Sequence, residues 1–211
     1  MIYKSLIQNL SGYIARELKL SDKKKAYIRY ALEVLISSLI SLIISLGLAY
    51  VLNIFWSVFW VIIVAAIMKS AAGGVHLKSP WECAVSTALF TNIMGYLSIQ
   101  FSYFLFRYYP FFLVVSLFYI MISLYFWSPA DVPEKPIKEK SKQRQLKRIS
   151  FFIAIIFAII VLLVFLLGGR EFAIIGISIL FGLIFQAFAI SPAAYKIQKF
   201  YYIIKQRNHK K

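Results

Sequence analysis

Hydrophobic residues occur along this chain in six long runs that are separated by short polar segments. The runs cover roughly residues 31–52, 54–72, 84–106, 108–127, 149–167 and 172–190. Each run is close to the ~20 residues that an α-helix needs to cross the hydrocarbon core of a bilayer. The pattern predicts an all-α, polytopic integral membrane protein with about six transmembrane helices.

The segment before the first run has a different pattern, in which apolar residues recur at steps of three and four positions. These residues are Ile2, Leu6, Leu10, Tyr13, Ile14 and Leu18. We therefore predict that residues 1–29 form an amphipathic helix at the cytoplasmic interface of the membrane. The alternative is a helix that packs on other cytoplasmic segments. The remainder of the single membrane domain 1–211 divides into a core at 30–190 and a basic tail at 191–211.

Composition supports lipid as the solvent of the folded chain. Of the 211 residues, 61% are hydrophobic and 15% are charged, and the mean hydropathy is +0.77. A soluble domain of this size cannot bury so much apolar surface. Within the first run, Ser37, Ser41 and Ser45 recur every four residues. This spacing predicts a face of small residues for close packing against another helix.

The charged residues are strongly biased in both sign and position. The chain has 24 lysines and arginines against 8 acidic residues, which gives a net charge of +16. Twenty-two of the basic residues fall in the segments 1–29, 69–83, 128–148 and 191–211, and the other two are Arg107 and Arg170. Because basic loops remain in the cytoplasm, we predict a multi-pass cell-membrane protein with both termini and the segment 69–83 in the cytoplasm. The charge also indicates anionic inner-leaflet lipids, rather than nucleic acid, as partners.

The candidate chemistry lies in the segment 69–83, which holds the only cysteine, Cys83, and one of two histidines, His76. Ser79-Pro80-Trp81-Glu82 predicts the start of a helix, with Ser79 as N-cap and Glu82 completing a capping box. Cys83 is then expected in the first turn, where the helix dipole lowers the pKa of a thiol. His76 can fold back as its base. The alternative is a buried apolar cysteine beside a solvated histidine.

The sequence does not decide whether a third catalytic group exists. Glu33, Glu82 and Asp131 are candidates to orient His76, and the absence of a third group is the remaining alternative. Asp131 lies in a proline-rich stretch that opens the basic loop 128–148, and that stretch can equally be a stiff connector. One cysteine and two histidines do not make a plausible zinc set. We therefore expect neither a metal nor another cofactor.

The run Gly73-Gly74-Val75-His76, followed by Cys83 in a protein of this topology, resembles the accessory gene regulator B family. The stretch from Pro129 to Ile137 is similar to the second signature of that family. The resemblance implies a membrane cysteine endopeptidase of Gram-positive bacteria, with Cys83 as nucleophile and His76 as general base. It also implies supporting roles for Gly74 and Lys69, although some family members have arginine at the position of Lys69.

The same resemblance implies a substrate and a product. The enzyme cuts the C-terminal tail from a small amphipathic quorum-sensing propeptide and helps to close the remaining peptide into a thiolactone or lactone ring. The basic cytoplasmic face predicts an acidic tail that meets the loop after the fourth run. The residues expected to contact it are Lys138, Lys140, Lys142 and Arg144. A homodimer is a further expectation. The rival interpretation is a small transporter or peptide exporter without hydrolytic activity, although the chain shows no convincing internal repeat.

Overall fold

The computed structural model describes residues 2–75, 77, 79–105, 108–130 and 139–208. Within these ranges the regular elements are seven α-helices. They are α1 (Ile2–Glu17), α2 (Asp22–Val51), α3 (Phe55–Ala72), α4 (Pro80–Leu105), α5 (Tyr109–Trp127), α6 (Lys140–Ala189) and α7 (Pro192–Asn208). The prediction of an all-α membrane protein is confirmed.

Five helical stretches among the described residues are long and apolar enough to cross a membrane. They are α2, α3, α5 and two parts of α6, Lys140–Gly168 and Phe172–Ala189. The remaining predicted span, the third apolar run, forms the 26-residue helix α4, which is long enough to cross but too polar to be counted with the others. Its polar side chains Thr91, Asn92, Ser98 and Ser102 are buried, so they face other helices rather than lipid.

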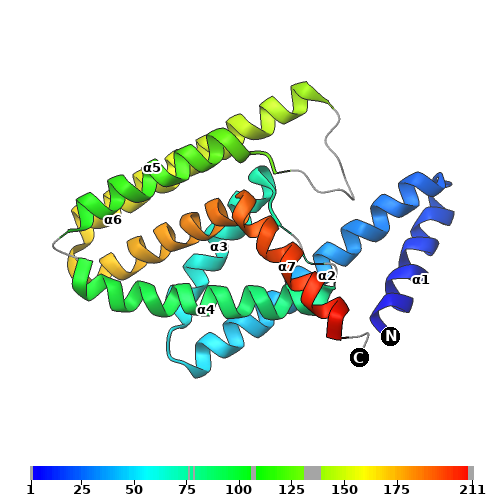
Figure 1. Ribbon diagram of the computed structural model, residues 1–211, viewed down its shortest axis with the longest axis horizontal. Coiled ribbons are helices and arrows are strands. Elements are labelled where there is room, and N and C mark those ends of the chain that lie inside the picture. The colour runs from blue at the N-terminus through cyan, green and yellow to red at the C-terminus, as the bar shows by residue number, and fades with distance from the viewer. Residues whose placement is uncertain (1, 76, 78, 106–107, 131–138, 209–211) are drawn as a thin grey trace.

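The chain reverses direction inside α6. Figure 1 shows α6 running beside α5 and then returning toward α7. A Cβ atom at Gly176 would lie 3.5 Å from the side chain of Val164, although twelve residues of straight helix span about 18 Å. The two halves of α6 therefore correspond to the fifth and sixth apolar runs of the sequence.

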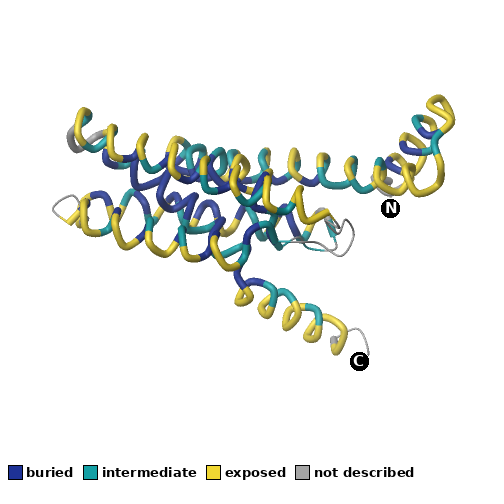
Figure 2. Tube along the Cα trace, turned by 90° about the horizontal axis from the view of Figure 1, so that it is seen from above, coloured by how far each residue is buried: buried dark blue, intermediate teal, exposed yellow. Residues whose placement is uncertain are grey.

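The core of the bundle lies where α3 packs on α6, with α4 and α5 on either side (Figures 1 and 2). Val64 and Met68 of α3, Ile120 of α5, and Leu180 and Leu183 of α6 belong to its fully buried centre. The outward positions of α5 and of the first half of α6 are apolar and exposed. Contiguous apolar surface of this kind requires a non-aqueous surrounding, which lipid provides.

The predicted small-residue face of α2 is buried. Ser37, Ser41, Ser45 and Ala49 form it, and small side chains allow neighbouring helices to approach closely. Asn92 of α4 donates hydrogen bonds to the carbonyls of Ser45, at 3.1 Å, and of its own helix. A buried amide thus links α4 to the small-residue face of α2.

The N-terminal segment differs from the single amphipathic helix expected over residues 1–29. α1 ends at Glu17, and Lys19 has a φ of 46°. A new helix, α2, starts after Ser21. The extended backbone of Ser21 suits the residue before a helix, and the acidic Asp22 is favourable in the first turn of α2. α1 packs on α2, while Leu6, Leu10 and Tyr13 remain exposed. α1 is therefore a separate helix that packs on α2, and its place at the cytoplasmic interface stays a prediction.

Candidate active site

Cys83 lies in the first turn of α4, as predicted. α4 begins at Pro80, and the Cys83 N–H donates to the carbonyl of Ser79 at 3.0 Å, closing the first turn of the helix. The side chain is buried, with 8% of the residue exposed. Cys83 therefore combines a position near the positive end of a helix dipole, which favours an anion, with burial, which opposes one.

Glu82, the residue before Cys83, has partners that differ from those of the predicted capping box. Its carboxylate accepts a hydrogen bond from the Tyr202 hydroxyl at 3.1 Å and forms an ion pair with Lys205, both from α7. Only 14% of its side chain is exposed. Burial alone raises the pKa of the Glu82 carboxyl, but the hydrogen bonds from Lys205 and Tyr202 outweigh it and hold the pKa below its ordinary value.

Gly73 connects the segment 69–83 to the proline-rich stretch that opens the loop 128–148. Its φ of 72° lies in the region that favours glycine, and its backbone forms a parallel bridge with Ala130. The Ala130 N–H donates to the carbonyl of Ala72 at 2.8 Å. The beginning of the proline-rich stretch is therefore docked directly on the glycine pair that precedes His76.

The other side of the glycine pair is held by the end of α6. The buried side-chain amide of Gln186 donates to the Gly73 carbonyl at 2.6 Å, and the Val75 N–H donates to the carbonyl of Ala189 at 3.0 Å. Backbone polar groups away from water need such partners. Residues 73–75 are thus fixed by α6 and by residue 130 immediately before the position of His76.

Several predicted site residues lie outside the described part of the chain, namely His76, Asp131 and Lys138. Among the other predicted site residues, Gly74 lies in the segment 73–75 and has a φ of 132°. Lys69 is exposed in the last turn of α3, and its carbonyl accepts a hydrogen bond from the Gly73 N–H at 3.0 Å. Glu33 pairs with Arg29 on its own helix at 3.9 Å.

The basic side chains Lys140, Lys142 and Arg144 are exposed in the first turns of α6. The last of them, Arg144, begins the lining of a hollow of about 360 Å³ that is formed by basic and apolar residues. Its lining comprises Arg144, Lys147, Arg148, Phe151, Phe152 and Ile155. The predicted contacts of this loop with an acidic tail stay a prediction.

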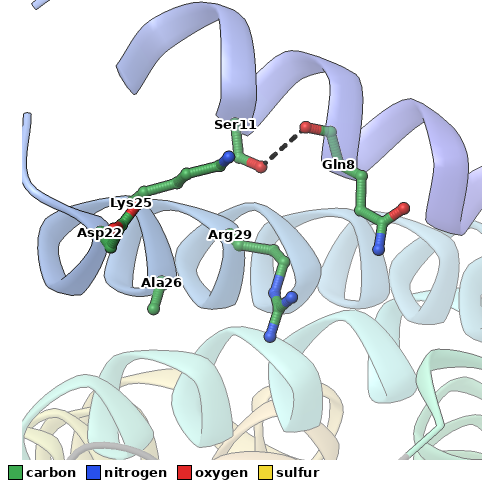
Figure 3. A pocket seen from close by; sticks show the side chains of 6 residues that line it. All are labelled: Gln8, Ser11, Asp22, Lys25, Ala26 and Arg29. Carbon is green, nitrogen blue, oxygen red and sulfur yellow. Dashed lines mark hydrogen bonds between the residues drawn. The ribbon is translucent and has the colours of Figure 1, made fainter. Parts of the chain in front are cut away.

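A second hollow, of about 400 Å³, lies between α1 and α2. Figure 3 shows its polar lining, in which the Ser11 hydroxyl donates to the Gln8 carbonyl at 3.1 Å. Neither hollow is lined by residues of the segment 69–83. Within the described ranges, no group of three or more His, Cys, Asp or Glu side chains could hold a metal ion.

Sequence reasoning identified Cys83 and its helix but missed the elements that surround them. Gln186 carried a signal, because a buried amide inside an apolar run needs a partner. Ala130 and Lys205 carried none, since their roles arise from contacts between segments that lie 57 residues apart (Gly73 and Ala130) and 123 residues apart (Glu82 and Lys205).

The fold and this site define a polytopic helical membrane protein with a single thiol at the start of one of its helices. Residues 7–190 match the sequence profile of accessory gene regulator B (AgrB). The chain therefore belongs to the AgrB family, and this membership gives it a role in the agr quorum-sensing system.

Two relatives from Clostridium perfringens support the assignment. The "Putative AgrB-like protein 2" of strain 13 / Type A is 28% identical over 197 residues, which cover 88% of this chain and 92% of the relative. The "Putative AgrB-like protein" of strain SM101 / Type A is 26% identical over the same shares. No solved structure matches the chain.

Proposed function

We propose that this protein is a membrane-embedded cysteine endopeptidase that cuts the C-terminal tail from a quorum-sensing propeptide. The observation that carries the proposal is the position of Cys83 in the first turn of α4. The anchored segment 73–75, which leads directly into His76, supports it. A thiol at a helix start with a histidine on the adjoining segment is the arrangement that a cysteine nucleophile needs.

The proposed reaction is acyl transfer. His76 takes the proton of the Cys83 thiol, and the thiolate attacks the scissile carbonyl of the propeptide. The amide bond breaks, the tail leaves with a proton from His76, and an acyl-enzyme thioester remains. A cysteine or serine of the bound peptide then attacks this thioester, which closes the ring and regenerates Cys83 without ATP.

The oxyanion that forms during attack needs hydrogen-bond donors. The Cys83 N–H already donates to Ser79, so the backbone N–H groups of Trp81 and Glu82 are the better candidates in this turn. Exclusion of water preserves the thioester until the ring closes. The burial of Cys83 is consistent with this need.

We further propose that the site faces the cytoplasm. Figure 1 shows the start of α4 and the end of α3 at the end of the bundle opposite to the turns after α2 and α4. Nearly all basic residues belong to segments at the first of these ends, and positive charge remains on the cytoplasmic side.

The proposal is tested by co-expressing the chain with a candidate agr-type propeptide and following cleavage. Cys83→Ala and His76→Ala should each abolish cleavage, and the double variant should be little worse than either, because nucleophile and base act as a unit. His209→Ala, which changes the other histidine, is the matched control and should cleave normally. Cleavage that persists in Cys83→Ala, with normal membrane insertion, would exclude the thiol mechanism.

A further inference from the structure

The C-terminal helix α7 lies beyond the part of the chain that matches the family profile, which ends at residue 190. It nevertheless reaches back to the candidate site, where Lys205 and Tyr202 contact Glu82 (Figure 1). These contacts join residues that are more than 100 positions apart in the sequence. α7 therefore touches the residue next to the nucleophile.

The chemistry of this contact matters because Glu82 is an acidic residue directly adjacent to Cys83. Neighbouring residues of a helix point in different directions, so Glu82 does not act as the base of Cys83 in this arrangement. Its charge still acts through space, and a bare carboxylate opposes formation of a thiolate nearby. The groups that face the Glu82 carboxylate are Lys205, Tyr202 and Tyr201, all from α7.

We propose that α7 positions and tunes the nucleophile, because Lys205 neutralises the Glu82 carboxylate and the Tyr202 hydroxyl holds that carboxylate against α7. This inference deepens the proposed function and rests on it. The ion pair balances the charge of the carboxylate that is adjacent to Cys83 in the sequence, so this carboxylate opposes ionisation of the thiol less. Lys205 and Tyr202 are positioning residues, since they act through Glu82 and not on the substrate.

Cys83 is the only cysteine of the chain, so alkylation by iodoacetamide reports its thiolate alone. The experiment measures the alkylation rate of the purified full chain in nanodiscs as a function of pH, without any propeptide. In Lys205→Gln, the apparent pKa of the thiol should rise by about one unit, the order expected for a unit charge within about 10 Å at a protein surface. The rate at pH 7 should fall roughly threefold to tenfold.

The double variant Glu82→Gln/Lys205→Gln removes both charges and should return the profile to that of the unaltered chain. Tyr202→Phe retains both charges and should shift the profile less than Lys205→Gln does. Lys199→Gln is the matched control, because Lys199 is an exposed lysine of the same helix. It loses the same charge and should leave the profile unchanged.

If the contact between Lys205 and Glu82 serves only to hold α7 on the bundle, the outcome differs. The thermal midpoint of Lys205→Gln then falls, but its alkylation profile does not change. That result, or a double variant that stays shifted, would overturn the inference. The proposed function fails by a separate measurement, the persistence of propeptide cleavage in Cys83→Ala. The alkylation profiles are measured on chains that retain Cys83 and do not depend on that result. The two failures are therefore distinguishable.

Discussion

Substitution of Gly73 by alanine should separate the segment 73–75 from Ala130, which lies against it at the start of the proline-rich stretch. Gly73 combines a φ of 72° with a ψ of −146°, which only glycine adopts readily and which costs alanine about 1–3 kcal/mol. A Cβ atom there would also lie closer than 3.0 Å to the Ala130 carbonyl oxygen. Relief of that overlap displaces Ala130 and breaks its hydrogen bond to Ala72, worth about 1 kcal/mol.

The expected total for Gly73→Ala is therefore a loss of about 2–4 kcal/mol in the free energy of unfolding. In a chain of this size, that loss lowers the thermal midpoint by roughly 5–15 °C. Gly74→Ala should lose less, because its Cβ would lie 3.4 Å from its nearest neighbours and only the backbone strain at a φ of 132° remains. Gly47→Ala is the matched control, since a Cβ there meets nothing within 4 Å.

The assay is thermal unfolding of the purified variants in one detergent, combined with cleavage of the propeptide well below the midpoint. Gly47→Ala should be neutral or more stable by about 0.5–1 kcal/mol, because alanine favours a helix interior over glycine. Gly73→Ala should also lose cleavage at temperatures where it is folded. A Gly73→Ala variant with the midpoint and cleavage rate of Gly47→Ala would refute the docking of residue 130 on this segment.

Three further predictions concern charge and orientation. First, the Glu82 carboxyl has a pKa lowered from 4.5, so the stability that its contacts supply is complete above pH 4.5 and is lost as the pH falls through the lower folded value. The difference in thermal midpoint from Glu82→Gln should thus be constant between about pH 6 and 9 and shrink below about pH 4.5, and a difference that grows in acid would contradict it. Second, single cysteines near Asn53, Arg107 and Gly169 in a Cys83→Ala background should react with an impermeant maleimide in intact cells, whereas one near Lys140 should not; labelling near Lys140 would reverse the orientation. Third, replacing four basic loop residues by glutamine should raise KM in a salt-dependent way with kcat nearly unchanged, because exposed charges act on encounter. The four are Lys138, Lys140, Lys142 and Arg144. A KM of this variant that equals the KM of the unaltered chain at both low and high salt would exclude recruitment by this loop.

The sequence was sufficient for features that depend on local pattern. The apolar runs predicted the helices, the four-residue spacing of Ser37, Ser41 and Ser45 predicted a buried face, and Ser79-Pro80 predicted the start of α4. Each of these depends on residues within a few turns of one another. Hydrophobic periodicity and helix capping are local physical effects, so they are readable without a structure.

Features that depend on long-range contacts were not predictable. Glu82 suits a capping box by its spacing, but an ion pair with Lys205 competes for the same carboxylate. The polar residues of α4 lowered its hydropathy without preventing the helix, because Asn92 and Ser98 find partners on α2 and α6. The glycine pair before His76 indicated unusual backbone, yet its contacts with Ala130 and Gln186 required the folded chain.

The most direct test of the account is to look for the acyl-enzyme itself. The full chain in nanodiscs is mixed with propeptide, quenched in acid within seconds, and its intact mass is measured. We expect an adduct on Cys83 whose mass equals that of the propeptide without its tail and without one water. This adduct should be released by neutral hydroxylamine and be absent in Cys83→Ala. A propeptide whose ring-closing residue is replaced by alanine should increase the adduct, because ring closure is blocked. Rapid cleavage of that propeptide with no adduct on Cys83 at any time would contradict nucleophilic catalysis by this residue.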